Sequence, residues 1–337
     1  MKIVKDRINL ASAVPLVRPF APMFEMSTRC NFACEFCPTA IPSERARTGF
    51  QRLDMEPDLF KRAIDELAAF PNTGQPFKAY YNGMGESCIH PQFVELIRYA
   101  VDNGGFSAHI IRTNGSFLEP EFNRQILEAG ITEVNISIEA VNEEGYKRVT
   151  KREGMFEKIV AGVTDLHNRR KAGQTRIYTK IIPLNTPDTD ETEFRRIFEP
   201  ISDMIDIELP MQWNNGMEYD TTRGLKTPEL TVNNDPITPN ITCPYIFYTL
   251  MINVVGVVHL CCFDWATMVN VGDMRENTLL EIWNGDKIKD FWRMHLRGER
   301  HLNPACRDCQ YIYGAPDYLT PEDRADILCR LHEYNGV

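Results

Sequence analysis

Six short apolar runs, separated by segments of helical periodicity, constrain the fold of this 337-residue chain more than any other feature. The connections are short, and strands that alternate with helices in this way are typical of a parallel sheet. Between the strands, apolar side chains recur at the spacing of one helical face. The predicted strands are Pro22–Ser27, Phe77–Tyr81, Phe106–Arg112, Glu133–Ile138, Ile177–Leu184 and Ile205–Pro210, and the predicted helices are Pro57–Phe70, Gln92–Asp102, Glu121–Ala129, Phe156–Arg169 and Glu191–Phe198.

Right-handed crossovers would curl such a sheet into a barrel or part of one. We therefore predict an α/β fold, a partial (β/α)6 TIM-like barrel over residues 22–213, preceded by an N-terminal extension at 1–21. Residues 214–240 are rich in Thr, Pro, Asn and Asp without a sustained period, so we expect a linker or capping loop there. A smaller α+β domain is predicted over 241–314, and a C-terminal helix over 315–337.

Charge and hydropathy narrow the functional classes. No apolar run reaches the length of a membrane span, and no apolar signal core follows the first seven residues, so we expect a cytoplasmic protein without a membrane partner. The net charge is 37 − 47 = −10, which argues against binding nucleic acid through its phosphates. Ten cysteines in a reducing compartment argue against a disulfide framework, so their grouping along the chain must indicate what they do instead.

The first cysteine group lies in the loop after the first predicted strand. Cys30, Cys34 and Cys37 have the spacing C-x3-C-x2-C, and soft thiolates select iron–sulfur clusters or zinc. A structural zinc site needs a fourth local ligand, yet the next candidates, Cys88 and His90, are far along the chain. Three ligands on a four-iron cluster leave one iron open for another molecule. A zinc knob remains the alternative for this group.

This spacing, with the aromatic Phe36 before the last cysteine, resembles the radical S-adenosylmethionine (SAM) superfamily. The resemblance implies that a 4Fe–4S cluster on these cysteines binds SAM and that its cleavage yields a 5′-deoxyadenosyl radical. The turn Gly83-Met84-Gly85-Glu86 resembles a Gly-Gly-Glu turn of the family, from which Met84 departs. There the backbone and Glu86 are implied to hold the SAM amino group.

Three further SAM contacts are implied by the same resemblance. Ser137 belongs to a familiar fourth-strand motif, and Arg152 resembles an arginine that pairs with the SAM carboxylate. A guanidinium suits that task because it donates two parallel hydrogen bonds. Asn114, after the third strand, is a weaker candidate of the same kind. Arg152 could equally be a solvated charge at a helix start, and the Gly83–Glu86 turn alone could be an ordinary βα loop.

A second cysteine group follows the predicted linker. Cys243 and Cys261 flank a predicted hairpin whose turn holds Gly256, and Cys306 and Cys309 form a C-x2-C pair. Four thiolates would fully ligate a four-iron cluster. A structural zinc site with four cysteine ligands fits the same spacing.

The pattern resembles the C-terminal SPASM extension of radical SAM enzymes, or its shortened twitch form. Residues 271–273 and 281–284 also recur in that extension, whereas Ala315 and Leu319 stand where the longer form has further cysteines. The resemblance therefore implies one auxiliary 4Fe–4S cluster, in addition to the SAM-binding one. Cys262 is either a spare thiol, an alternative ligand or a hydrogen-atom donor.

The substrate is the least constrained part of the prediction. The stretch before the first cysteine is expected to be too short for a peptide-binding domain, which favours a small molecule over a peptide. Aminocyclitol dehydrogenases and aminoglycoside epimerases of the family share this organisation. We predict a sugar, an aminocyclitol or an aminoglycoside-like substrate whose alcohol is oxidised to a ketone. Expected pocket residues are Gln212, Trp213 and Asn214, after the sixth strand.

Three alternatives remain open at this point. One is epimerisation of the same substrate class with Cys262 as the hydrogen donor, and another is peptide modification. The third is an iron–sulfur or zinc protein without enzymatic activity. If the protein is a radical SAM enzyme, the resemblance implies a flavodoxin- or ferredoxin-type protein as its reductant.

Overall fold

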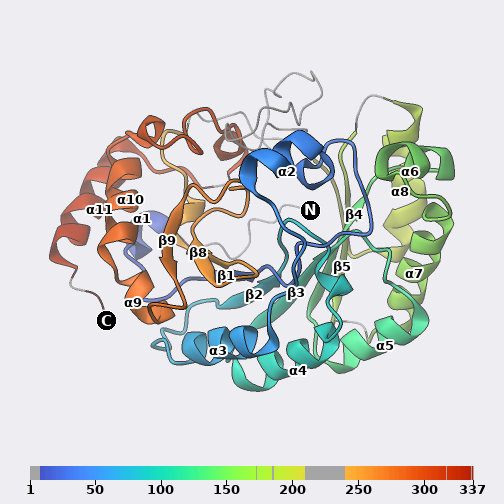
Figure 1. Cartoon of the computed structure of the whole chain (residues 1–337), viewed down its shortest axis with the longest axis horizontal. Helices are drawn as coiled ribbons and strands as arrows, with labels where there is room; N and C mark the ends of the chain where they lie inside the picture. Colours follow the sequence, from blue (N-terminus) through green and yellow to red (C-terminus); the bar gives the residue numbers. More distant parts are fainter. Residues whose placement is uncertain are drawn as a thin grey trace.

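The computed structural model contains one mixed sheet with helices on its outer side (Figure 1). In the part of the chain that it describes, the sheet has nine strands in the order β6-β5-β4-β3-β2-β1-β7-β8-β9. Strands β6 and β9 are its two edges, so the sheet does not close into a barrel. The described residues are 8–171, 173–183, 186–208, 240–315, 317–334 and 336.

The first six strands are parallel, which confirms the predicted α/β class and the partial barrel. Each of the six predicted strands and each of the five predicted helices has a counterpart, with ends that differ by a few residues. The strands are β1 (Ala21–Phe24), β2 (Lys78–Tyr81), β3 (Ala108–Thr113), β4 (Glu133–Ile138), β5 (Arg176–Ile181) and β6 (Met204–Ile207), and the helices are α3 (Pro57–Ala68), α4 (Phe93–Asn103), α5 (Pro120–Glu128), α7 (Phe156–Arg169) and α8 (Glu191–Phe198).

The two faces of this sheet differ in chemistry. In β5, Ile177, Thr179 and Ile181 are buried, whereas Tyr178 and Lys180 between them are half-buried. Successive strand residues point to opposite faces, so the helices cover the face of Ile177 while Tyr178 and Lys180 face the interior of the partial barrel. Each large apolar side chain buried under the helices contributes roughly 1.5–3 kcal/mol to folding. The apolar face therefore holds the scaffold together and leaves the polar face for binding.

The cysteine-rich part after residue 240 extends the same sheet. Strand β7 (Thr249–Ile252) pairs in parallel with β1, in a register that sets Ala21 opposite Thr249. Strands β8 (Val257–His259) and β9 (Asn270–Asp273) then add antiparallel pairs. The β7–β8 hairpin turns through Gly256 at φ +89°, a conformation that other residues rarely adopt, which confirms the predicted hairpin. This part is joined to the partial barrel through β1.

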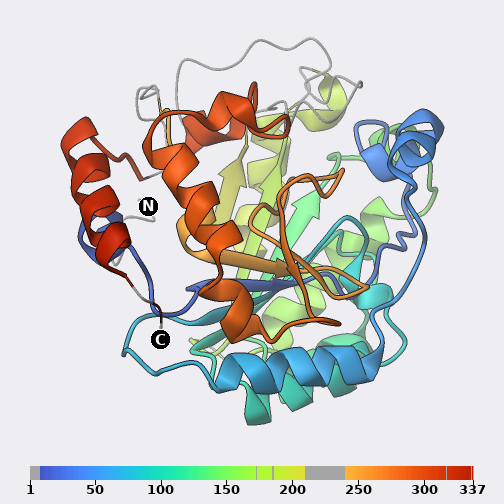
Figure 2. The ribbon, with the colours of Figure 1, turned by 60° about the vertical axis from the view of Figure 1, so that its left-hand side comes forward.

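The two ends of the described chain pack together on the far side of this extension (Figure 2). The short helix α1 (Leu10–Ala13) contacts α11 (Pro321–Glu333), the helix predicted near the C-terminus. Arg330 of α11 donates a 3.0 Å hydrogen bond to the carbonyl oxygen of Val14. Within the described ranges, no helix combines the length and the apolar character that crossing a bilayer requires.

Five α-helices of the described residues were not predicted from the sequence: α1, α2 (Pro42–Thr48), α6 (Glu143–Thr150), α9 (Leu279–Trp283) and α10 (Asp286–Leu296). Helix α10 is as long as α4, whereas the other four are shorter, and α6 is largely polar. Its start is set by Asn142, whose side chain accepts a hydrogen bond from the Gly145 N–H. The last turn of α6 matters for the site described next.

Candidate functional site

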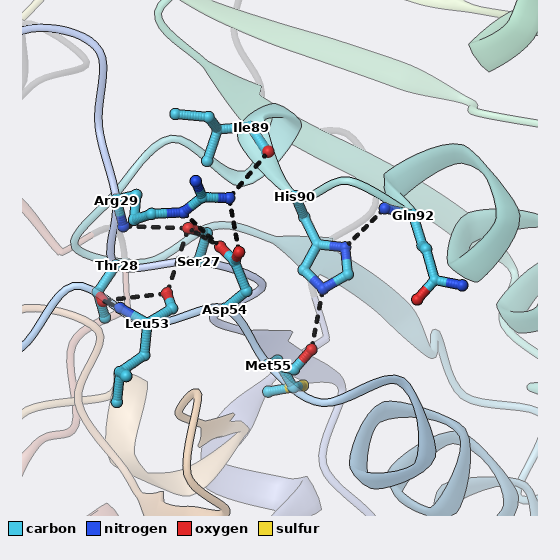
Figure 3. Close-up of polar contacts among 9 residues, drawn as sticks. All are labelled: Ser27, Thr28, Arg29, Leu53, Asp54, Met55, Ile89, His90 and Gln92. Carbon is cyan, nitrogen blue, oxygen red and sulfur yellow. Dashed lines mark hydrogen bonds and ion pairs between the residues drawn. The ribbon is translucent and has the colours of Figure 1, made fainter.

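Hydrogen bonds hold the stem of the loop with the first three cysteines (Figure 3). The Ser27 hydroxyl donates to Asp54 Oδ1 at 2.7 Å, and Nε of Arg29 donates to the same oxygen at 2.9 Å. The Thr28 N–H donates to the Leu53 carbonyl oxygen at 2.9 Å. The chain that leaves β1 is thus fixed on residues 53 and 54 immediately before the first cysteine.

The far side of the loop is held by the end of α6. The N–H groups of Ala33 and Glu35 each donate a 3.0 Å hydrogen bond, to the carbonyl oxygens of Thr150 and Val149. Arg148 also forms a 3.0 Å ion pair with the Glu35 carboxylate. Backbone contacts at both ends therefore decide where the three thiols lie.

The three thiols of this loop suit a cationic iron cluster. The Phe32 N–H donates to the Cys30 sulfur at 3.4 Å, and the Thr39 hydroxyl lies 3.1 Å from the Cys37 sulfur. Burial raises the pKa of all three thiols, that of Cys30 to about 12, and each ionised neighbour would raise it further. Thiolates form here only if a positive charge compensates them, which is what cluster iron supplies.

The glycines of the turn after β2 allow two chain segments to approach closely. A Cβ atom at Gly83 would lie 2.5 Å from Cγ of Glu25, and one at Gly85 would lie 2.4 Å from the Ser27 carbonyl oxygen. A side chain at either position would collide with the chain that continues β1. The Met84 N–H also donates to Glu25 Oε1 at 2.9 Å, so the turn is pressed against the stem of the cysteine loop.

Glu86, at the end of this turn, ties it to β3. Its buried carboxylate accepts hydrogen bonds from the Thr113 hydroxyl at 2.9 Å, the Asn114 N–H at 2.7 Å and the Cys88 N–H at 3.0 Å. Burial raises the pKa of Glu86, and these bonds act against that rise. The contact of Glu86 with the SAM amino group stays a prediction.

Two of the predicted SAM contacts meet beside the first cysteine. The Asn114 amide lies 3.8 Å from the sulfur of that cysteine and donates to Oδ1 of Asn31 at 3.0 Å. Nε of Arg152 donates to the Asn31 carbonyl oxygen at 2.6 Å. Ser137 is half-buried in β4, and Phe36 is half-buried in the cysteine loop. Their roles toward SAM also stay predictions.

The second cysteine group comes from three segments that line one cavity. Cys243 precedes the turn η6 (Tyr245–Phe247), and Cys261 follows β8. Burial raises the pKa of each thiol of the group, that of Cys243 to about 12. The cavity is lined by Cys243, Cys261, Cys262, Cys306 and Cys309, with Arg300 and His295 among their neighbours. The four predicted ligands therefore gather at one place, together with Cys262.

Arg300 and His295 hold the backbone of this group. Arg300 donates to the carbonyl oxygens of Cys306 and Cys309, and its charge opposes the rise in the pKa that burial causes at both thiols. The Cys243 N–H donates to Nδ1 of His295 at 3.3 Å. Among the described residues, no three His, Cys, Asp or Glu side chains are close enough to hold a single metal ion. Thiolates of a four-iron cluster bind different irons and do not need to meet at one point.

A polar lining of the interior was missed by the sequence analysis. Lys180 forms a 2.8 Å ion pair with Glu208, and the Tyr178 hydroxyl donates to Asp206 Oδ2 at 3.0 Å. Arg112 of β3 shares this face. Of β3, β5 and β6, only β5 has a polar residue at every second position, at Arg176, Tyr178 and Lys180. The predicted pocket residues Gln212, Trp213 and Asn214 lie outside the described residues.

Comparison with known proteins identifies the family. Residues 24–199, more than half of the chain, match the radical SAM superfamily model, and residues 243–310 match SPASM, an iron–sulfur cluster-binding domain. The chain belongs to the radical SAM superfamily. This radical SAM enzyme uses SAM and iron–sulfur clusters, and both cysteine groups described above fall within the matched ranges.

The relatives of this radical SAM enzyme differ in how much of it they cover. The S-adenosyl-L-methionine-dependent 2-deoxy-scyllo-inosamine dehydrogenase of Niallia circulans is 20% identical over 288 residues, 86% of this chain and 91% of that protein. The tungsten-containing aldehyde ferredoxin oxidoreductase cofactor-modifying protein of Pyrococcus furiosus is 31% identical over 117 residues, 35% of this chain. The chain spans only 30% of that protein and 37% of a further curated relative.

A solved structure agrees with the likeness to the dehydrogenase. The crystal structure of BtrN in complex with AdoMet and 2-DOIA has a TM-score of 0.57, with 15% identity. The match covers 90% of this chain and 96% of that chain. At this identity the match shows a shared fold, including the C-terminal extension.

Proposed function

We propose that this radical SAM enzyme oxidises an alcohol of a small polyhydroxylated substrate to a ketone. The observation that carries the proposal is the second cysteine cavity, which offers four thiols in addition to the SAM-binding three. A fully ligated cluster is suited to take up an electron. The dehydrogenase of Niallia circulans, similar over 86% of this chain, supports the same reaction class. Sugars, aminocyclitols and aminoglycoside-like molecules are the substrates we consider.

When bound, SAM and the clusters supply a 5′-deoxyadenosyl radical, which removes a hydrogen atom from carbon, and an acceptor for the second electron. The residues of this chain orient the substrate and receive its hydroxyl proton. Burial raises the pKa of Asp206, which makes its carboxylate a better proton acceptor, and the Tyr178 hydroxyl holds it in place.

Epimerisation remains a second candidate because of one observation. Cys262 packs against the small apolar cluster of Ala21, Met23 and Met251, which contains inward-facing residues of β1 and β7. A thiol there could return a hydrogen atom to the substrate carbon. In either case we propose a flavodoxin- or ferredoxin-type protein as the reductant.

One experiment separates the two reactions. The anaerobically reconstituted enzyme is incubated in heavy water with SAM, a reductant and 2-deoxy-scyllo-inosamine, and the product is analysed by mass spectrometry. Oxidation predicts a ketone, equimolar with 5′-deoxyadenosine, in the wild type and in Cys262→Ala alike. Deuterium at a product carbon that disappears in Cys262→Ala would mean epimerisation, and no turnover would reject this substrate.

A further inference from the structure

Two charged side chains of the interior lack a partner among the described residues. Arg112 makes no hydrogen bond or ion pair there, and its guanidinium lies 5.2 Å from the centre of the Tyr80 ring. The carboxylate of Glu139 accepts no hydrogen bond from the described residues, although its backbone N–H donates to the Tyr146 hydroxyl at 3.3 Å. The neighbouring Lys180 and Glu208 form an ion pair with each other. Burial raises the pKa of Glu139, and the charge of Lys180 opposes that rise, so Glu139 has a cation nearby but no direct ion pair with a described residue.

The two unpaired groups lie at opposite ends of the interior. Arg112 pairs in register with Asn135 of β4, and Glu139 is four residues beyond Asn135, a rise of roughly 13 Å along the strand. Burial raises the pKa of Cys262 and the Arg112 charge opposes that rise, so Arg112 lies near the auxiliary cysteines. Glu139 instead adds to the burial that raises the pKa of Cys34, so it lies near the SAM-binding cysteines.

Such groups need a ligand of matching chemistry. A guanidinium has five N–H donors and no acceptor, and a carboxylate has acceptors only. A half-buried charge without a hydrogen-bond partner is unfavourable unless a bound molecule supplies that partner. The hydroxyl or carbonyl oxygens of a substrate satisfy Arg112, whereas an ammonium group satisfies Glu139.

We propose that Arg112 and Glu139 bind the substrate at the two ends of the interior, and that the substrate is an amino alcohol. Arg112 donates to its oxygen atoms, and Glu139 accepts from its ammonium group. This inference rests on the proposed function and narrows the substrate class to polyhydroxylated molecules that carry an amine. In this arrangement, the apolar side chains of Met23 and Met251 contact the carbon skeleton of the substrate.

The test measures binding as well as turnover. Calorimetry of the holoenzyme compares 2-deoxy-scyllo-inosamine with its analogue that has a hydroxyl in place of the amine. We expect the wild type to bind the amine at least about tenfold more tightly, as charged hydrogen bonds imply. Glu139→Gln should remove this preference and leave the affinity for the analogue unchanged. Arg112→Met should weaken both ligands equally, and Arg112→Lys should restore part of the loss.

Controls separate this role from effects on folding and on SAM. Arg196→Met changes an exposed arginine that is paired with Glu193, so it should alter neither ligand affinity. Iron content and the unfolding midpoint of each variant should match the wild type. SAM also carries an ammonium group, so SAM affinity is measured in Glu139→Gln. A loss of SAM affinity equal to the loss for the amine would overturn the assignment of Glu139.

The outcomes also separate this inference from the proposed function. Tight, amine-selective binding without ketone formation would reject the oxidation and support the binding residues. In the opposite case, the enzyme forms the ketone, binds both ligands with equal affinity and shows no change in Glu139→Gln. That result would reject the inference and would still support the oxidation. A wild type that binds neither ligand would overturn the amino-alcohol class.

Discussion

The two cysteine groups of this enzyme reach their positions in different ways. Cys30, Cys34 and Cys37 belong to one loop, whose stem and far side are both fixed by backbone hydrogen bonds. Cys243, Cys261, Cys306 and Cys309 come from three segments that the β7–β8 hairpin and its neighbours bring to one cavity. Because β1 and β7 are paired, both groups depend on adjacent strands of one sheet.

We propose that the number of sulfur ligands follows from the number of chain segments that provide them. In this proposal, the single loop provides three sulfurs and leaves one coordination position for SAM. Several segments can surround a cluster completely, which suits electron transfer but leaves no position for a substrate.

Cys34→Ser should abolish SAM cleavage, because two thiolates cannot hold the SAM-binding cluster. Iron content should fall from roughly eight to roughly four per chain, as the cluster stoichiometry requires. The measurements are iron analysis and detection of 5′-deoxyadenosine after reduction. Undiminished cleavage in this variant would contradict the assignment of the first cysteine group.

The double variant Cys306→Ala, Cys309→Ala should show the opposite pattern. It should lose roughly four irons and all ketone formation, but should still cleave SAM without coupling to the substrate. The readout is the ratio of 5′-deoxyadenosine to ketone. If this variant still made ketone, the auxiliary cluster would not be the electron acceptor.

The scaffold behind the two sites predicts a pH effect that does not involve iron. Burial lowers the pKa of His109 to about 4, and the Tyr81 hydroxyl lies 2.7 Å from its Nδ1 atom. The unfolded chain binds this proton first, so the contribution is intact above pH 6.5 and is lost as the pH falls toward 4. The loss should approach about 3 kcal/mol.

Urea unfolding of the wild type and of His109→Gln between pH 4 and pH 7 measures this contribution. The variant should show a shallower decline of the unfolding free energy over the same range. Parallel curves for the two proteins would show that His109 does not titrate as the structure implies.

Asn114→Ala tests how far the first group depends on its surroundings. The amide lies 3.8 Å from the Cys30 sulfur. Mutation of a group that contacts a metal ligand typically lowers metal affinity or activity about 10–100-fold. We expect a change of about tenfold, because the cluster keeps its three ligands. The measurement is the rate at which a chelator removes iron, and Cys34→Ser, which loses a ligand, should give the fastest rate.

Cys262→Ser should have the smallest effect on the clusters. If four other cysteines hold the auxiliary cluster, iron content and the electron paramagnetic resonance signal of that cluster should match the wild type. A variant that loses roughly half of its iron would place Cys262 among the ligands.

Local patterns predicted much of this molecule. The alternation of apolar strands and amphipathic helices gave the order of the first six strands, and Gly256 marked the hairpin turn because its positive φ excludes most residues. The spacing of Cys30, Cys34 and Cys37 was sufficient to place three thiols in one loop. In each case the decisive interactions lie within a few residues of sequence.

Other features required the three-dimensional structure. The pairing of β1 with β7 joins segments more than 200 residues apart, and no local period encodes it. Lys180 could not be assigned to the interior, since a polar residue at every second strand position also occurs where a sheet faces water. Arg112 could not be assigned either, because it is a single charged residue after Ala108 and Ile110 on the same face of β3. The roles of Glu86 and Asn114 in holding the loops together became visible only as hydrogen bonds.

We propose that the first cluster has one iron without a protein ligand. Mössbauer spectroscopy of the iron-57 protein, in the Cys306→Ala, Cys309→Ala variant, tests this vacancy. We expect SAM to shift the signal of one in roughly four irons, the iron that binds it. Spectra that are identical with and without SAM would contradict the open iron and would favour a cluster with four protein ligands.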